Sequence, residues 1–111
     1  MTVPTKLHIV IHQGATYSQD VATALHANGA AINLSTYTGS AQIRKHYTSL
    51  TKNDFTVTLA NTGVVTLSMT ANTTSSIVPG RYVYDAEITS NTGVVTRLVE
   101  GIATVTPQVT R

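Results

Sequence analysis

Two histidines four residues apart, His8 and His12, are the nearest approach to a metal-binding pattern in the sequence. They lie in the run KLHIVIH, in which apolar and polar residues alternate as in a half-buried strand. On a strand that rises roughly 3.3 Å per residue, the two side chains stand about 13 Å apart, too far to share one ion. We therefore expect surface histidines and no bound metal.

Two carboxylates on one strand face, Asp85 and Glu87, are the nearest approach to an acid–base pair. Residues two apart on a strand share a face, so the geometry allows a pair. Carboxylates in such positions more commonly bond basic neighbours, here Arg81 or Arg97, and a general acid also needs a shifted pKa. We expect a solvated strand face rather than a catalytic site.

A serine triad with Asp20 and His26 has no local motif behind it, because the sequence contains no nucleophile elbow. It also contains no phosphate-binding glycine loop and no Asp-rich calcium loop. The six aromatic residues are spread along the strand-like runs and form no stacking platform. We therefore predict a protein that is not an enzyme and holds no cofactor.

Composition bounds the class of protein. At 111 residues the chain has the size of a single domain, residues 1–111, and 41% hydrophobic residues suffice for a core. The absence of cysteine excludes a disulfide framework. A net charge of +2, with no basic cluster beyond Arg44 and Lys45, argues against nucleic acid. No apolar stretch reaches the roughly 18 residues of a membrane span, so we expect no membrane partner.

Short alternating runs bounded by turn residues predict β-strands along most of the chain. The predicted strands are 6–12, 17–25, 41–47, 55–60, 64–69, 81–88 and 94–106. For the second of these a short helix over 18–27 is an alternative, because alanine, aspartate and leucine recur there. The hexapeptide NTGVVT occurs at 61–66 and 91–96, and we interpret both copies as tight hairpin turns.

Two further features complete the predicted architecture. A helical turn with Asn72 as N-cap is expected within 71–78, and a bulge is expected at Gly101, where the alternation changes parity. The predicted fold is an all-β, antiparallel β-sandwich of about seven strands with at most one short helical turn. Its predicted core comprises Leu7, Ile9, Ile11, Ile43, Phe55, Val57, Leu59, Leu67, Tyr82, Tyr84 and Ile88. Ile32 and Leu34 are further predicted core residues, in an irregular connection over 30–38.

Three segments carry a resemblance to a known family: QGATYSQDV, INLSTYTGSAQIRK and PGRYVYDAEIT with GVVTRLVEGIATVTPQVTR. They resemble immunoglobulin-like β-sandwich domains of tailed-bacteriophage virions, similar to the N-terminal domains of baseplate subunits that carry receptor-binding proteins. Gly80, Tyr82, Tyr84, Asp85 and Glu87 match the family's G-x-Y-x-Y-D-l-e segment. In the earlier D-L-T-G-Y-t box, Asn33 replaces the acidic residue and one residue is inserted before Tyr37.

The resemblance implies an immunoglobulin-like structural protein of the virion, assembled in the host cytoplasm, that mediates contacts in tail, neck or baseplate. Head decoration, or recognition of carbohydrate or a host surface by the same fold, are the alternatives. Its partners would be other virion proteins and further copies of itself. Candidate interface residues are the apolar Val10 and Val83 on nominally solvent-facing positions, and the residues Gln108, Val109, Thr110 and Arg111 of an extended tail over 106–111.

Overall fold

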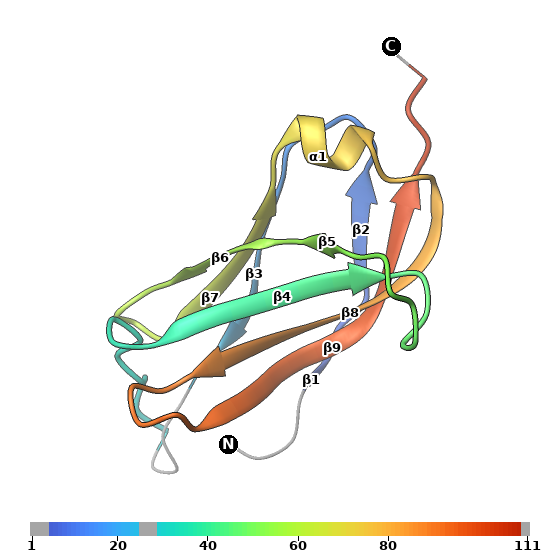
Figure 1. The fold of residues 1–111 in the computed structure, drawn as a ribbon. Coiled ribbons are helices and arrows are strands. Elements are labelled where there is room, and N and C mark those ends of the chain that lie inside the picture. The colour runs from blue at the N-terminus through green and yellow to red at the C-terminus, as the bar shows by residue number, and fades with distance from the viewer. Residues whose placement is uncertain (1–4, 25–28, 110–111) are drawn as a thin grey trace.

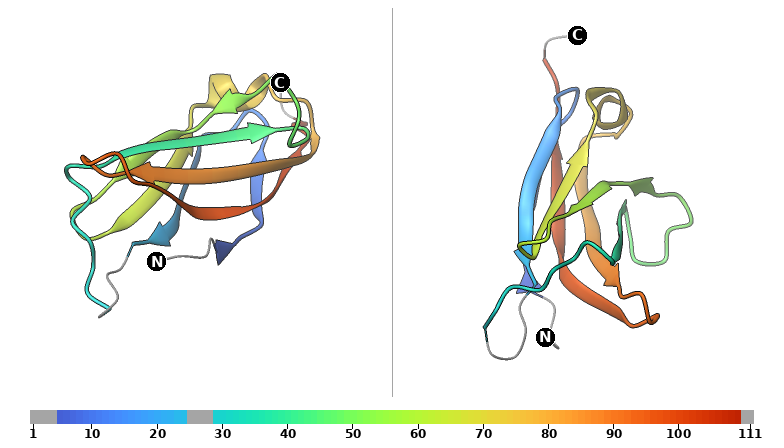
Figure 2. Two further views of the ribbon diagram at one scale, coloured as in Figure 1. Left: turned by 60° about the horizontal axis from the view of Figure 1, so that its bottom comes forward. Right: turned by 90° about the vertical axis from the view of Figure 1, so that its left-hand side faces the viewer.

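Two β-sheets packed face to face form the molecule in the computed structural model, which describes residues 5–24 and 29–109 (Figures 1 and 2). The larger sheet has the order β1-β9-β8-β4-β5, with β2 also paired to β9. The smaller has the order β3-β7-β6. The strands are β1 (Thr5–Lys6), β2 (Ile9–His12), β3 (Tyr17–Thr23), β4 (Thr38–Arg44), β5 (Asn53–Asp54), β6 (Thr56–Leu59), β7 (Val64–Met69), β8 (Gly80–Thr89) and β9 (Val95–Thr106), and a single helix, α1 (Ala71–Ser75), links β7 to β8.

The predicted all-β sandwich is confirmed, with nine strands in the described residues where about seven were expected. Part of the difference arises because the single strand predicted over 6–12 is divided into β1 and β2, which separate at Leu7 and His8. Another short strand, β5, lies between the strands predicted over 41–47 and 55–60, where no strand was expected. The segment 17–23 is a strand and not a helix, whereas 25–27 of the helical alternative lie outside the described residues.

The pairing is not antiparallel throughout, which corrects the prediction. Both N-terminal strands run parallel to the C-terminal strand β9, with Thr5 opposite Val99 and Ile9 opposite Ala103. Antiparallel strands that follow one another can be joined by a tight turn, which the sequence reveals. Parallel strands need a long connection, and no local sequence signal marks their pairing. In this chain that connection is almost the whole fold.

Both predicted hairpins are present. In the β8–β9 turn the amide of Ser90 donates to the carbonyl oxygen of Val94 at 2.9 Å, and Gly93 has a φ of +91°. In the β6–β7 turn the amide of Ala60 donates to the carbonyl oxygen of Val64 at 3.0 Å. Glycine favours the positive φ that such turns require, which is why the NTG sequence predicts them.

The bulge of β9 lies at Leu98 and not at Gly101. Ala86 is paired with Val99 and the next residue, Glu87, is paired with Arg97, so Leu98 is the extra residue. Leu98 and Val99 are both buried as a result. The sequence pattern predicted a change of parity but not its position. Glycine at position 101 allows the close approach of the Leu7 backbone and is not part of the bulge.

Several element boundaries differ from expectation, most of all in β4, which begins at Thr38 where residue 41 was predicted. β4 ends at Arg44, because the chain turns there through reciprocal bonds between His46 and Ser49, at 3.0 Å each. Tyr47, expected at the end of this strand, is therefore 81% exposed. The helical turn is capped by Thr70 rather than Asn72: its hydroxyl accepts the amide proton of Thr73 at 3.3 Å.

The core lies between the sheets and centres on three aromatic rings. Phe55 stands between Tyr17 and Tyr84, with ring centroids 6.0 and 6.2 Å away. The other predicted core residues that are buried are Ile9, Ile11, Ile32, Leu34, Ile43, Leu67 and Ile88. Four predicted members, Leu7, Val57, Leu59 and Tyr82, pack against this core but are only partly buried.

Candidate functional site

The outer face of the six-stranded sheet, the face turned away from β3, β7 and β6, carries the two apolar residues predicted as interface. Val83 lies opposite Ile102, and Val10 lies opposite Thr104, in the ladders on either side of β9. Paired residues project to the same face, so Val10, Ile102 and Val83 lie on one side of three adjacent strands. We call these three residues the apolar strip. Val10 is 51% exposed, and the other two are half-buried.

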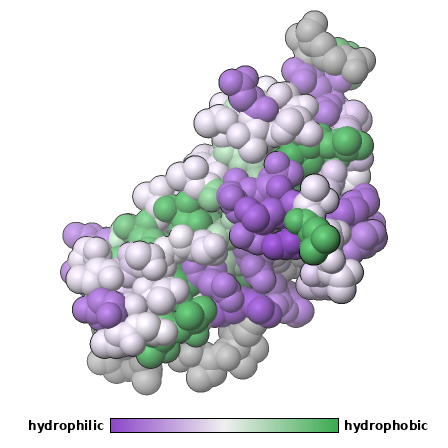
Figure 3. Space-filling model, viewed as in Figure 1, coloured by the Kyte–Doolittle hydropathy of each residue, from purple (hydrophilic) through white to green (hydrophobic). Residues whose placement is uncertain are grey.

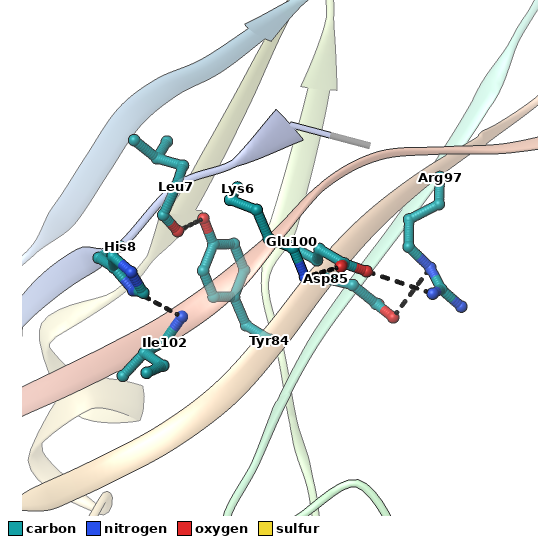
Figure 4. Close-up of polar contacts among 8 residues, drawn as sticks. All are labelled: Lys6, Leu7, His8, Tyr84, Asp85, Arg97, Glu100 and Ile102. Carbon is teal, nitrogen blue, oxygen red and sulfur yellow. Dashed lines mark hydrogen bonds and ion pairs between the residues drawn. The ribbon is translucent and has the colours of Figure 1, made fainter. Parts of the chain in front are cut away.

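A chain of charges borders the apolar strip. Lys6 is bonded to Glu100, whose other oxygen lies 3.3 Å from Arg97 Nη1, and Arg97 Nε lies 3.5 Å from Asp85 Oδ2 (Figure 4). These residues come from β1, β9 and β8. The bond from Lys6 holds the pKa of the Glu100 carboxyl below its usual value, and the same contact raises the pKa of Lys6. The two cations and two carboxylates neutralise one another.

The same outer face is hydrophilic over much of its width. Figure 3 shows polar residues gathered across the middle of the visible face, between smaller hydrophobic areas. A shallow hollow of about 240 Å³ lies there, bordered by Gln42 and Arg44 of β4 and by the charged residues of β8 and β9. Apolar atoms surrounded by polar ones are the usual arrangement of a contact surface between proteins.

The two carboxylates of β8, Asp85 and Glu87, have different surroundings. Asp85 is bound to Arg97, as anticipated, whereas Glu87 makes no hydrogen bond or ion pair with the described residues. Asp20, the acid of the serine triad considered from the sequence, accepts a hydrogen bond from the hydroxyl of Thr66 at 2.6 Å. His26 lies outside the described residues.

The two histidines are occupied separately along β9. Nδ1 of His8 accepts the amide proton of Ile102 at 3.3 Å, and Nδ1 of His12 lies 2.8 Å from the hydroxyl of Thr106. No group of three or more potential metal ligands occurs in the described part of the chain. Within the same residues, no helix has the length and apolarity needed to cross a membrane.

The predicted tail is partly fastened to the domain. Thr106 still belongs to β9, and the amide of Gln108 donates to the side-chain oxygen of Gln13 at 3.1 Å. The side-chain nitrogen of Gln13 in turn donates to the carbonyl oxygen of Ile77 at 3.1 Å. Val109 is 91% exposed, and Thr110 and Arg111 lie outside the described residues. The tail, predicted to extend over 106–111, is thus attached to the domain as far as Gln108.

Sequence reasoning missed Ile102 and Lys6 as members of this surface. Ile102 follows Gly101, and the misplaced bulge had left its face undetermined. Lys6 reaches Glu100 only because β1 lies along β9, 94 residues away in the sequence. The one sequence signal for Ile102 was its position as an apolar residue directly after Gly101. No local signal marks Lys6.

Comparison with known proteins gives no family. No family model matches the chain, and no curated protein matches it. An internalin-like protein of Listeria monocytogenes, lmo2027, is similar in structure with 20% identity and a TM-score of 0.43, covering 95% of this chain and 28% of that one. A family 123 glycoside hydrolase from Clostridium perfringens has 13% identity and a TM-score of 0.41, covering 96% and 24%. The chain spans less than a third of either protein, and neither likeness bears on function.

Proposed function

We propose that this chain is a structural module of a tailed-phage virion, an immunoglobulin-like domain that mediates subunit contacts in tail, neck or baseplate. The family is suggested by the sequence resemblance alone. The observation that carries the assembly role is the apolar strip of Val10, Ile102 and Val83, which lies on one sheet face beside neutralised charges. The charges of Lys6, Glu100, Arg97 and Asp85 are already paired, whereas Arg81, opposite Thr104 on the same face, has no carboxylate partner among the described residues and would need one from the neighbour.

The strip is tested by placing a charge in it. Val10→Asp should reduce incorporation of the protein into particles by about tenfold, because a buried interface cannot accept an unpaired carboxylate. The matched control is Leu50→Asp, which adds the same charge at an exposed apolar residue in the loop after β4. Circular dichroism and thermal unfolding of both purified variants establish that they remain folded.

Equal incorporation of the Val10 and Leu50 variants would contradict the role of the strip. Failure of the wild-type chain to enter any particle, when it is co-expressed with the structural genes that neighbour its own, would contradict the virion assignment itself. The two outcomes are separate, because the first compares variants and the second does not.

The C-terminal residues form a second part of this proposal. Deletion of 109–111 removes the exposed Val109 with Thr110 and Arg111 but retains Gln108 and its bond to Gln13. The truncated domain should unfold at the same temperature as the full chain and enter particles less efficiently. Undiminished uptake would exclude these residues from the contact.

A further inference from the structure

A groove of about 460 Å³ lies at the end of the larger sheet, where β4 ends and β8 begins. Its base is apolar, since Ile43 and Ile77 are buried there, and Val78 beside them is 70% exposed. Arg44 and Lys45 line it from the end of β4, and Lys52 lines it from the loop before β5. We call this the basic groove. Its lining residues come from the end of β4, the loop before β5, the segment that follows α1 and β8, and Figure 1 shows the tip of β4 near the segment after α1.

Two cations of the basic groove have only neutral partners. The guanidinium of Arg44 donates to the carbonyl oxygen of Ser49 and, at 2.9 Å, to the side-chain oxygen of Gln42. The ammonium of Lys45 stands 4.9 Å from the centre of the Tyr82 ring. These contacts hold both groups in place without cancelling their charge.

Three of the other four lysines and arginines that the structure describes are paired with carboxylates, and one of these three, Lys52, also lines the groove. Lys6 and Arg97 are bound to Glu100 and Asp85, and Lys52 is bound to both oxygens of Asp54, at 3.0 and 2.9 Å. Among the Lys and Arg residues that the structure describes, Arg44, Lys45 and Arg81 have no carboxylate partner. Two of these three line the same groove, next to an exposed valine.

We infer that the basic groove binds an acidic peptide segment that also carries an aliphatic side chain. The carboxylates would pair with Arg44 and Lys45, and the aliphatic group would cover Val78 and the apolar base. A peptide fits better than a nucleic acid, because the positive charge is confined to one short groove and the Tyr82 ring is occupied by Lys45. The inference rests on the assembly role proposed above insofar as a neighbouring subunit would supply the segment.

Binding is measured on the isolated full-length domain with a dye-labelled peptide of glutamates flanking a single leucine, by fluorescence anisotropy. Lys45→Gln should weaken binding by about two- to fivefold, the range expected for one exposed charge contact. Arg81→Gln is the matched control: it removes the same charge from an exposed residue of β8 that does not line the groove. Binding should also weaken as salt is raised.

Chemical-shift changes provide a readout that does not depend on a variant folding. The peptide should shift the amide resonances of Lys45, Ile77 and Val78 more than those of Val10 and Ile102. Equal loss of affinity in the Lys45 and Arg81 variants, undetectable binding, unchanged binding of a peptide with glutamine in place of glutamate, or tighter binding of single-stranded DNA would each overturn the inference. Because no particle is involved, these outcomes are independent of the virion assignment.

Discussion

The C-terminal strand β9 is held along its two edges in contrasting ways. On one edge lies β8, joined to it by a tight turn at Gly93 and paired antiparallel over almost its whole length. On the other edge lie β1 and β2, which arrive from the far end of the chain and pair in parallel. The hairpin edge is specified by residues within the turn, whereas the remote edge depends on contacts that only the folded chain creates.

A few specific contacts around Leu7 attach β1 and β2 to the remote edge of β9. Gly101 has no side chain, so the backbone of Leu7 can pass over it: an added Cβ would lie 2.2 Å from the Leu7 carbonyl oxygen. Tyr84, opposite Gly101, donates its hydroxyl proton to that same oxygen at 2.6 Å. The amide of Leu7 donates to the carbonyl oxygen of Glu100 at 2.9 Å. Together these contacts bridge the gap between β1 and β2.

The largest effect on this comparison is expected from Gly101→Ala. The new methyl group would displace the Leu7 backbone, and we expect a loss of about 2–3 kcal/mol in the free energy of unfolding, as for an overpacked site. Urea unfolding of the variant measures it. A loss below ~1 kcal/mol would mean that Leu7 does not pass this close to β9.

Tyr84→Phe should come next, at about 1–2 kcal/mol. It removes the hydroxyl and leaves the Leu7 carbonyl oxygen without that donor, while the ring retains its place against Phe55. Tyr82→Phe is the control, because its hydroxyl bonds to Val78 outside the remote edge. Equal protection of the Leu7 amide from hydrogen exchange in the two variants would show that Tyr84 does not secure this edge.

The same tyrosine predicts how the fold responds to alkali. Burial raises the pKa of Tyr84 and raises that of Tyr17 to about 12. Because their pKa values are about 10 in the unfolded chain, the stabilisation is complete below pH 10 and is lost as pH rises toward the folded values. Tyr84→Phe should therefore lose less stability between pH 9 and 11 than the wild-type chain. Identical alkaline unfolding curves would contradict this assignment.

The features that could be predicted from the sequence are local ones like the hairpin edge of β9, and those that could not include its remote edge. The hairpins at 61–63 and 91–93, the strand β6 (Thr56–Leu59) and the burial of Phe55 could all be predicted, because alternation and the Asn-Thr-Gly turns act over a few residues. The parallel pairing and the role of Gly101 could not, because each depends on residues far away in the sequence. The bulge was predicted at Gly101 and lies at Leu98. Of the apolar strip, Val10 and Val83 were placed on the solvent-facing side from the sequence, whereas Ile102 between them was not.

The hairpin edge offers a smaller test, Gly93→Ala. The residue has a φ of +91° but no atom near a new methyl group, so the cost is backbone strain alone, about 1 kcal/mol. Urea unfolding compares it directly with Gly101→Ala. A loss equal to that of the Gly101 variant would remove the distinction between the two edges.

The smallest effect concerns the ion pair of Lys6 and Glu100. Because Glu100 has a lowered pKa and Lys6 a raised one, their mutual stabilisation is present between about pH 4.5 and 10.5. It is lost as pH falls through the folded value of Glu100 or rises through that of Lys6. Both groups meet solvent, so we expect Glu100→Gln to change stability slightly at low salt and not at high salt. Thermal unfolding at two salt concentrations measures the difference, and a loss that persists at high salt would contradict it.

The account depends most on the attachment of β1 and β2 to β9, since only this pairing places Val10 beside Ile102 on the outer face. Amide hydrogen exchange followed by NMR tests it most directly, through the amides of Leu7 and Gln13, which donate to Glu100 and Thr106 of β9. The account predicts that both amides are protected to a similar extent as those of the β8–β9 ladder. Exchange of Leu7 and Gln13 at the rate of an unstructured peptide, while β8 and β9 remain protected, would contradict it.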